Sequence, residues 1–132
     1  MREPHQEHTP DADPRWPAAL ALFNGEAWYE AHDAFEELWH ETMGPDRPLL
    51  QGIVQIAVAH VHLERGNARG ATVLLGEALG RLQGCEDGSL GLDLTRLRRT
   101  IADRLQLLQQ GAEIAALTAL PLPELRALHT GP

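Results

Sequence analysis

Apolar residues recur every three or four positions along most of this chain, which is the spacing of residues on one face of an α-helix. Two stretches show the pattern without interruption. Between positions 67 and 83 it consists of Ala71, Leu74, Leu75, Ala78, Leu79 and Leu82, and between 93 and 110 of Leu94, Leu97, Ile101, Leu105 and Leu108. No segment alternates apolar and polar residues over a useful length, as a half-buried strand would. The pattern therefore predicts an all-α fold.

Capping residues and helix breakers divide the chain into five helices and a shorter sixth. Asn67 and Asp93 stand at N-cap positions, whereas Gly25 and Gly66 follow helix ends. The connections are short, so helices adjacent in the sequence should pack on one another in a compact bundle. The predicted helical ranges are 14–23, 26–42, 46–65, 67–83, 93–110 and 112–119.

The chain of 132 residues is long enough for one domain with its own core. We expect a flexible, polar lead-in over 1–13, which contains His5 and His8 and ends in an N-cap at Asp13. A single helical domain should follow over 14–120. Prolines then predict an extended tail over 121–132.

Three glycines fall inside predicted helices rather than at their ends. They are Gly52, Gly70 and Gly76. Each costs roughly 1 kcal/mol of helix stability relative to Ala. We expect them to allow close crossings between helices.

The helix over 46–65 is apolar around almost its whole circumference, which is typical of a buried central helix. The exception is a narrow polar stripe of Gln51, Gln55 and His62, which lie within about 40° of one another on a helical wheel. Amides and an imidazole form hydrogen bonds in a confined space without carrying a permanent charge. His60 is expected on the apolar side of this helix or against a neighbouring helix.

His32 and Glu36 lie one helical turn apart on the helix over 26–42, beside an apolar stripe. That stripe includes Trp28, Phe35 and Trp39. Polar groups are costly to bury without partners, so we expect this pair to meet the polar stripe of the central helix. The predicted pocket consists of His32, Glu36, Trp39, Gln51, Gln55 and His62.

The residue types leave several functions open. The pocket would bind a small ligand, or His32, Glu36 and His62 would hold a divalent metal such as zinc, iron or manganese. As a catalytic site it would use Glu36 as the general base, with His32 or His62 as metal ligand or proton shuttle. The alternative is a buried hydrogen-bond network without chemistry. In that case the chain is a protein-interaction or homodimerisation module.

Charge and composition restrict the partners. A net charge of −8 opposes binding to a phosphate backbone, so nucleic acid is not expected. The lone cysteine, Cys85, cannot form an internal disulfide, and no apolar run reaches membrane-spanning length. We therefore expect a cytoplasmic protein without a membrane partner. We expect the basic cluster to form a solvated helix face; its members are Arg96, Arg98, Arg99 and Arg104.

A set of linked motifs resembles one known family. The motifs are Phe23-Asn24-Gly25, Trp28-Tyr29-Glu30-Ala31-His32, Glu36-Glu37-Leu38-Trp39, Leu50-Gln51-Gly52-Ile53-Val54-Gln55-Ile56-Ala57, His62-Leu63, Gly66-Asn67 and Gly70-Ala71. From about Trp16 to Leu82 the chain resembles the prokaryotic helical family catalogued as domain of unknown function 309. The resemblance implies a compact all-α domain and a family without an established biochemical role. Its motif positions correspond here to Asn24, Gly25, His32, Glu36, Trp39, Gln51, Gln55, His62 and Asn67.

Overall fold

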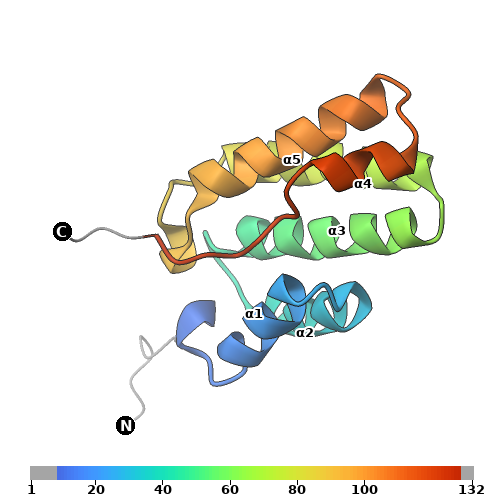
Figure 1. The fold of residues 1–132 in the computed structure, drawn as a ribbon. Coiled ribbons are helices and arrows are strands. Elements are labelled where there is room, and N and C mark those ends of the chain that lie inside the picture. The colour runs from blue at the N-terminus through green and yellow to red at the C-terminus, as the bar shows by residue number, and fades with distance from the viewer. Residues whose placement is uncertain (1–8, 129–132) are drawn as a thin grey trace, which may run out of the picture.

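Five α-helices and three short 3₁₀ helices make up the computed structural model, which describes residues 9–128 (Figure 1). Within that range, extended backbone pairs only at one isolated antiparallel bridge, between Leu92 and Ala127. The predicted all-α class is confirmed. The α-helices are α1 Trp16–Asn24, α2 Trp28–Glu41, α3 Arg47–Glu64, α4 Ala68–Gln83 and α5 Leu94–Gln109. The 3₁₀ helices are η1 Pro10–Ala12, η2 Ser89–Gly91 and η3 Ile114–Ala119.

Helix α3 lies in the middle of the bundle, as its apolar circumference predicts. Figure 1 shows α1 and α2 on one side of α3, and α4 and α5 with η3 on the other. The helices pack mainly on their sequence neighbours. The core between these layers contains the fully buried side chains of Phe23, Phe35, Leu50, Ile53, Ile56, Leu75, Leu82, Leu97 and Ile101.

Aromatic rings hold α1 against α2. Trp16 and Phe35 meet edge to face with ring centroids 5.6 Å apart, and Phe23 meets Trp28 in the same way at 5.1 Å. Edge-to-face pairs place the positive ring edge against the negative ring face, which adds to the gain from burial. Trp16, Phe23, Trp28 and Phe35 therefore form one packed layer.

The ends of α1 and α3 have the same hydrogen-bond pattern but different residues at the left-handed position. After α3, Gly66 takes a φ of 76°, and Asn67 N–H donates to His62 O at 2.8 Å. After α1, the corresponding bond runs from Ala27 N–H to Leu22 O at 2.9 Å. The residue with positive φ there is Glu26, at 64°, and not Gly25. The left-handed residue of this turn therefore lies one position later than the sequence predicts.

Side-chain caps occur at two of the predicted positions. Asn67 Oδ1 accepts from Gly70 N–H at 2.9 Å, and Asp93 Oδ1 accepts from Arg96 N–H at 3.0 Å. Asp46 occupies the N-cap of α3 but makes no side-chain cap bond. The caps at Asn67 and Asp93 begin α4 and α5 where the sequence predicts.

The first described residues differ from the predicted flexible lead-in. Pro10 is buried within η1. Helix α1 begins at Trp16 rather than at 14, because Asp13 has extended backbone and its Oδ1 accepts from Arg15 N–H. His5 and His8 lie outside the described residues.

The C-terminal segment returns to the start of the fold in extended form. Leu125 N–H donates to Asn24 Oδ1 at 2.8 Å, and Asn24 Nδ2 donates to Leu125 O at 3.1 Å. Asp93 N–H donates to Arg126 O at 2.8 Å. The side chain of Asn24 thus joins the end of α1 to the tail, a role beyond ending the helix.

The internal glycines do not all serve helix crossings. A Cβ on Gly52 would lie 3.6 Å from Ala78 O of α4, an ordinary contact, and one on Gly76 would meet open space. A Cβ on Gly70 would lie 2.7 Å from Asn67 Nδ2 and 3.2 Å from His62 Cγ. Only Gly70, of these three, is required by its surroundings.

None of the helices within residues 9–128 has the length and apolar character needed to cross a membrane.

Candidate functional site

A hollow between α2 and α3 contains most of the predicted pocket. It has a volume of about 150 Å³ and is lined by Glu36, Trp39, Gln51, Val54 and Gln55. Glu36 and Trp39 come from adjacent turns of α2, and the two glutamines come from adjacent turns of α3. Four of the six predicted pocket residues therefore surround one space.

His32 lies beside this hollow and not among its lining residues. Its Nε2 is 3.4 Å from Glu36 Oε2, and its Nδ1 is 3.2 Å from Asp33 Oδ1. The edge of its ring also faces Tyr29, with ring centroids 5.8 Å apart. Both carboxylates are well exposed, so His32 belongs to the rim of the hollow and positions Glu36.

Trp39 combines a covered ring with an unsatisfied donor. The Arg47 guanidinium lies 4.0 Å from the centre of its ring, and Arg47 Nη1 donates to Trp39 O and Thr42 O, each at 3.0 Å. The Nε1–H of Trp39 is shut off from solvent and has no hydrogen-bond partner. A buried donor left unpaired costs roughly 1–3 kcal/mol, so this N–H marks a place where an acceptor would be gained.

Gln55 bonds toward α4 instead of α2. Its Nε2 donates to Glu77 Oε1 at 2.9 Å, and its Oε1 accepts from Arg81 Nε at 3.0 Å. Gln55 therefore lines the same hollow as Glu36, as predicted, but its side-chain hydrogen bonds go to α4. Glu77 and Arg81 of α4 supply charged partners for both ends of this amide.

His62 lies far from the hollow along α3, near the end of the helix. Its Nδ1 is 3.2 Å from Asn67 Nδ2, next to the cap of α4. Among residues 9–128 no group of three or more His, Cys, Asp and Glu side chains is placed to hold a metal ion. Metal binding by His32, Glu36 and His62 stays a prediction.

Comparison with known families identifies the first half of the molecule. Residues 16–74 match the model of the family described as Domain of unknown function (DUF309). The chain contains a DUF309 domain. No curated protein matches the chain. The matched segment includes α1 to α3 and the first part of α4, so the DUF309 region contains the whole lining of the hollow, whereas Glu77 and Arg81 lie beyond it.

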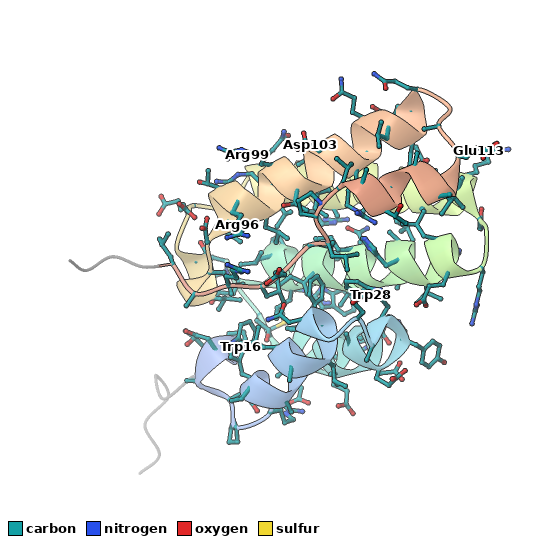
Figure 2. All side chains as sticks on the ribbon, viewed as in Figure 1. Trp16, Trp28, Arg96, Arg99, Asp103 and Glu113 are labelled. Atoms are coloured by element: carbon teal, nitrogen blue, oxygen red, sulfur yellow. The ribbon has the colours of Figure 1, made fainter. Side chains whose placement is uncertain are left out.

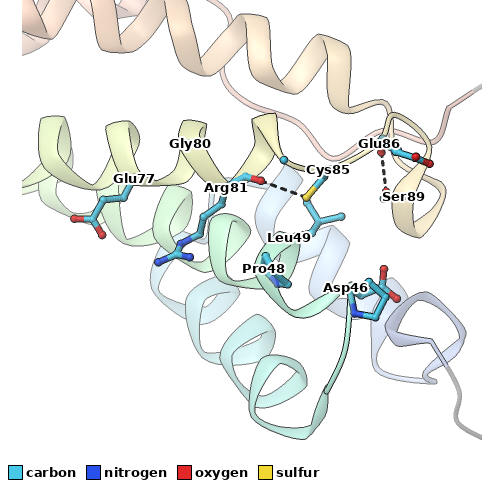
Figure 3. A pocket seen from close by; sticks show the side chains of 11 residues that line it. Asp46, Pro48, Leu49, Glu77, Gly80, Arg81, Cys85, Glu86 and Ser89 are labelled. Atoms are coloured by element: carbon cyan, nitrogen blue, oxygen red, sulfur yellow. Dashed lines mark hydrogen bonds between the residues drawn. The ribbon is translucent and has the colours of Figure 1, made fainter.

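A second groove lies between the start of α3 and the end of α4 (Figure 3). Most of its lining residues follow residue 74, where the DUF309 match ends. Its volume is about 710 Å³. Two of its side chains bond to nearby backbone: Cys85 Sγ donates to Arg81 O at 3.3 Å, and Ser89 Oγ donates to Glu86 O at 2.7 Å. Burial raises the pKa of the Cys85 thiol, which disfavours the nucleophilic thiolate. The thiol of Cys85 is therefore not activated as a nucleophile.

Only part of the arginine cluster at positions 96–104 forms the predicted solvated face. Arg96 and Arg99 are exposed, but Arg98 Nη1 donates to Leu82 O at 2.8 Å and to Cys85 O at 3.0 Å. Arg104 is only 4% exposed. The sequence could have predicted this burial, because Arg104 lies two helical turns from Leu97 and one turn from Ile101, on the same face of the helix.

Proposed function

We propose that the DUF309 domain binds a compact polar ligand in the hollow between α2 and α3. The observation that carries this proposal is that Trp39, which has a buried Nε1–H donor without a partner, lines the same hollow as Glu36 and Gln51. Gln51 has no hydrogen-bond partner within residues 9–128. Three polar groups from two helices thus have bonding capacity left at one place.

The volume of the hollow limits the size of the ligand. Sites for drug-sized molecules usually have volumes of about 300–1,000 Å³, whereas this hollow has about 150 Å³. A ligand with only a few non-hydrogen atoms fits. Larger molecules would have to extend into solvent past Glu36, whose side chain is 44% exposed.

The chemistry of the walls limits the class of ligand. Trp39 Nε1–H only donates, and the carboxylate of Glu36 only accepts. His32 contacts Oε2 of Glu36, which leaves Oε1 for a ligand donor. A group that carries a donor and an acceptor side by side, as a primary amide does, can form hydrogen bonds with both Trp39 and Glu36.

The proposed function is binding and not catalysis. Of the five residues that line the hollow, Glu36 is the one ionisable group. General acid–base chemistry usually needs a second group that returns the proton. His32, the nearest imidazole, is already flanked by two carboxylates.

Acetamide and N,N-dimethylacetamide are suitable probes, because both carry the carbonyl acceptor but only acetamide has N–H donors. We expect acetamide, titrated in the millimolar range, to shift the indole ¹H–¹⁵N signal of Trp39, which a Trp39→Phe variant assigns. Dimethylacetamide should shift it less. Glu36→Gln and Gln51→Leu should weaken the effect, whereas Gln83→Leu on the exposed face of α4 should not. A Trp39 signal that stays unmoved, or moves equally in all three variants, would refute the proposal.

A further inference from the structure

A cavity of about 460 Å³ lies on the other side of α3 from the Gln55 network, under η3 and the start of the tail. It is separate from the hollow at Trp39, because the two spaces share no lining residue. Its volume falls within the range usual for sites that take small molecules. Its walls come from the start of α2, the end of α3, α5, η3 and the tail, and include Trp28, Leu63, Ile114, Leu117, Leu120 and Leu122.

Trp28 and His60 form one wall. Their rings lie with centroids 4.5 Å apart and planes inclined by 31°, and His60 is only 2% exposed. Figure 2 labels Trp28 where α2 faces α3. His60 Nδ1 donates to Ile56 O at 2.8 Å, so Nε2 is the unprotonated nitrogen of a neutral ring, and it has no partner. Burial lowers the pKa of His60 to about 4, so this wall carries no charge at neutral pH.

Arg104 places a buried cation at the same cavity. Its Nη1 donates to Pro121 O at 3.1 Å and to Leu117 O at 3.4 Å, which holds the segment above the cavity in place. No carboxylate within residues 9–128 forms an ion pair with it. Its Nε–H is buried without a partner, and Nη2 has none among the described residues. The side of the guanidinium formed by Nε and Nη2 is therefore unused.

That unused side has a specific complement. Two parallel N–H donors at the edge of a guanidinium match the two oxygens of a carboxylate. A buried cation is costly unless it is paired. The apolar side chains among the remaining walls would bury the hydrocarbon part of a ligand.

We propose that this cavity binds a small apolar carboxylate, whose carboxylate pairs with Arg104 and whose hydrocarbon body packs against Trp28 and the leucines of η3 and the tail. Glu26 and Glu64 also line the cavity and are exposed. Their charges disfavour an anion near the entrance, so a polyanion would be excluded and a single carboxylate binds best when it lies inside. Glu26 also has a left-handed backbone, with φ of 64°. Strained residues of this kind concentrate at ligand sites.

Hexanoate and hexanamide provide a matched pair of probes, because they have nearly the same shape and differ in charge. We expect hexanoate to bind at least about tenfold more tightly than hexanamide by calorimetry, since hydrogen bonds to charged groups contribute most. It should shift the indole signal of Trp28 and leave that of Trp39 in place. Acetate, which has the charge without the body, should bind much more weakly than hexanoate.

Arg104→Met should remove the preference for hexanoate over hexanamide, because it keeps the volume of the side chain and deletes its donors. Circular dichroism reports whether this variant folds. Glu64→Gln changes only an exposed residue and should raise the affinity for hexanoate roughly two- to fivefold. Glu37→Gln, an exposed change on α2 away from the cavity, is the matched control and should have no effect.

Equal binding of the two probes by the unmodified protein would overturn the proposal. A folded Arg104→Met variant that keeps the preference would also overturn it. Should Arg104→Met not fold, Glu64→Gln decides, because an affinity for hexanoate equal to that of Glu37→Gln places the carboxylate elsewhere.

Discussion

Glu26→Gly should stabilise the protein, although most glycine substitutions near helices destabilise. Glu26 has a φ of 64° in the turn after α1, and a non-glycine residue in the left-handed region costs roughly 1–2 kcal/mol. Glycine removes that cost but increases the entropy of the unfolded chain, which takes back roughly 0.5–1 kcal/mol. Glu26 is exposed, and its side chain has no hydrogen bond or ion pair within the described residues. The net gain should therefore be about 0.5–1 kcal/mol.

Urea unfolding followed by tryptophan fluorescence measures this gain. With a denaturant dependence of about 1.5 kcal/mol per molar urea, the midpoint should rise by roughly 0.3–0.7 M. Gly66→Ala is the mirror experiment at the same turn position after α3, where φ is 76° and a Cβ would meet nothing within 4 Å. It should lower stability by about 1 kcal/mol through backbone strain alone. Glu37→Gly, inside α2, should lower stability by a similar amount through helix propensity.

An unchanged or lowered midpoint for Glu26→Gly, together with the expected loss for Gly66→Ala, would contradict this prediction. That result would mean that the backbone at Glu26 is not strained.

The remaining predictions concern His60 and two glycines of α4. His60 has a pKa of about 4 in the folded protein against 6.5 in the unfolded chain, so the unfolded state binds more protons between these values. Stability should therefore fall as pH falls from about 6.5 to 4, by about 3 kcal/mol in all at about 1.4 kcal/mol per pH unit. Urea midpoints of the unmodified protein and His60→Asn, compared across this range, test it, and parallel curves would contradict it. Gly70→Ala should lose at least about 1 kcal/mol by displacing Asn67 from its cap, whereas Gly76→Ala, with open space around it, should gain up to about 1 kcal/mol in the same assay.

Local signals in the sequence predict the helices well. Asn67 and Asp93 cap their helices with the expected bonds, because a cap depends on residues only three positions apart. The central place of α3 follows from its apolar circumference, and His60 lies on its buried side as expected. The one misplaced turn, at Glu26, breaks the local rule that glycine occupies the left-handed position.

Partners across helices are less predictable, because a helical wheel gives the face of a residue and not the neighbour that it meets. Gln55 and Glu36 do line one hollow, yet Gln55 bonds to α4. His62 shares the wheel position of Gln51 but lies about 16 Å along the helix from it, at 1.5 Å per residue. The neighbours of Arg104 could not be predicted from the sequence, because only the three-dimensional packing places it beside His60 under η3.

The two hydrogen bonds between Asn24 and Leu125 join residues that are 101 positions apart in the chain. During synthesis, Asn24 leaves the ribosome long before Leu125 is made. Helices α1 to α4 can pack on their sequence neighbours during that interval, but the end of α1 has to wait for its tail partner. The DUF309 region is thus complete in sequence at residue 74 and complete in structure only after residue 125. A fragment that stops at residue 74 should leave the side chain of Asn24 exposed to water and uncover the face of α3 opposite α1 and α2. Experiments on this domain therefore need the chain through its tail.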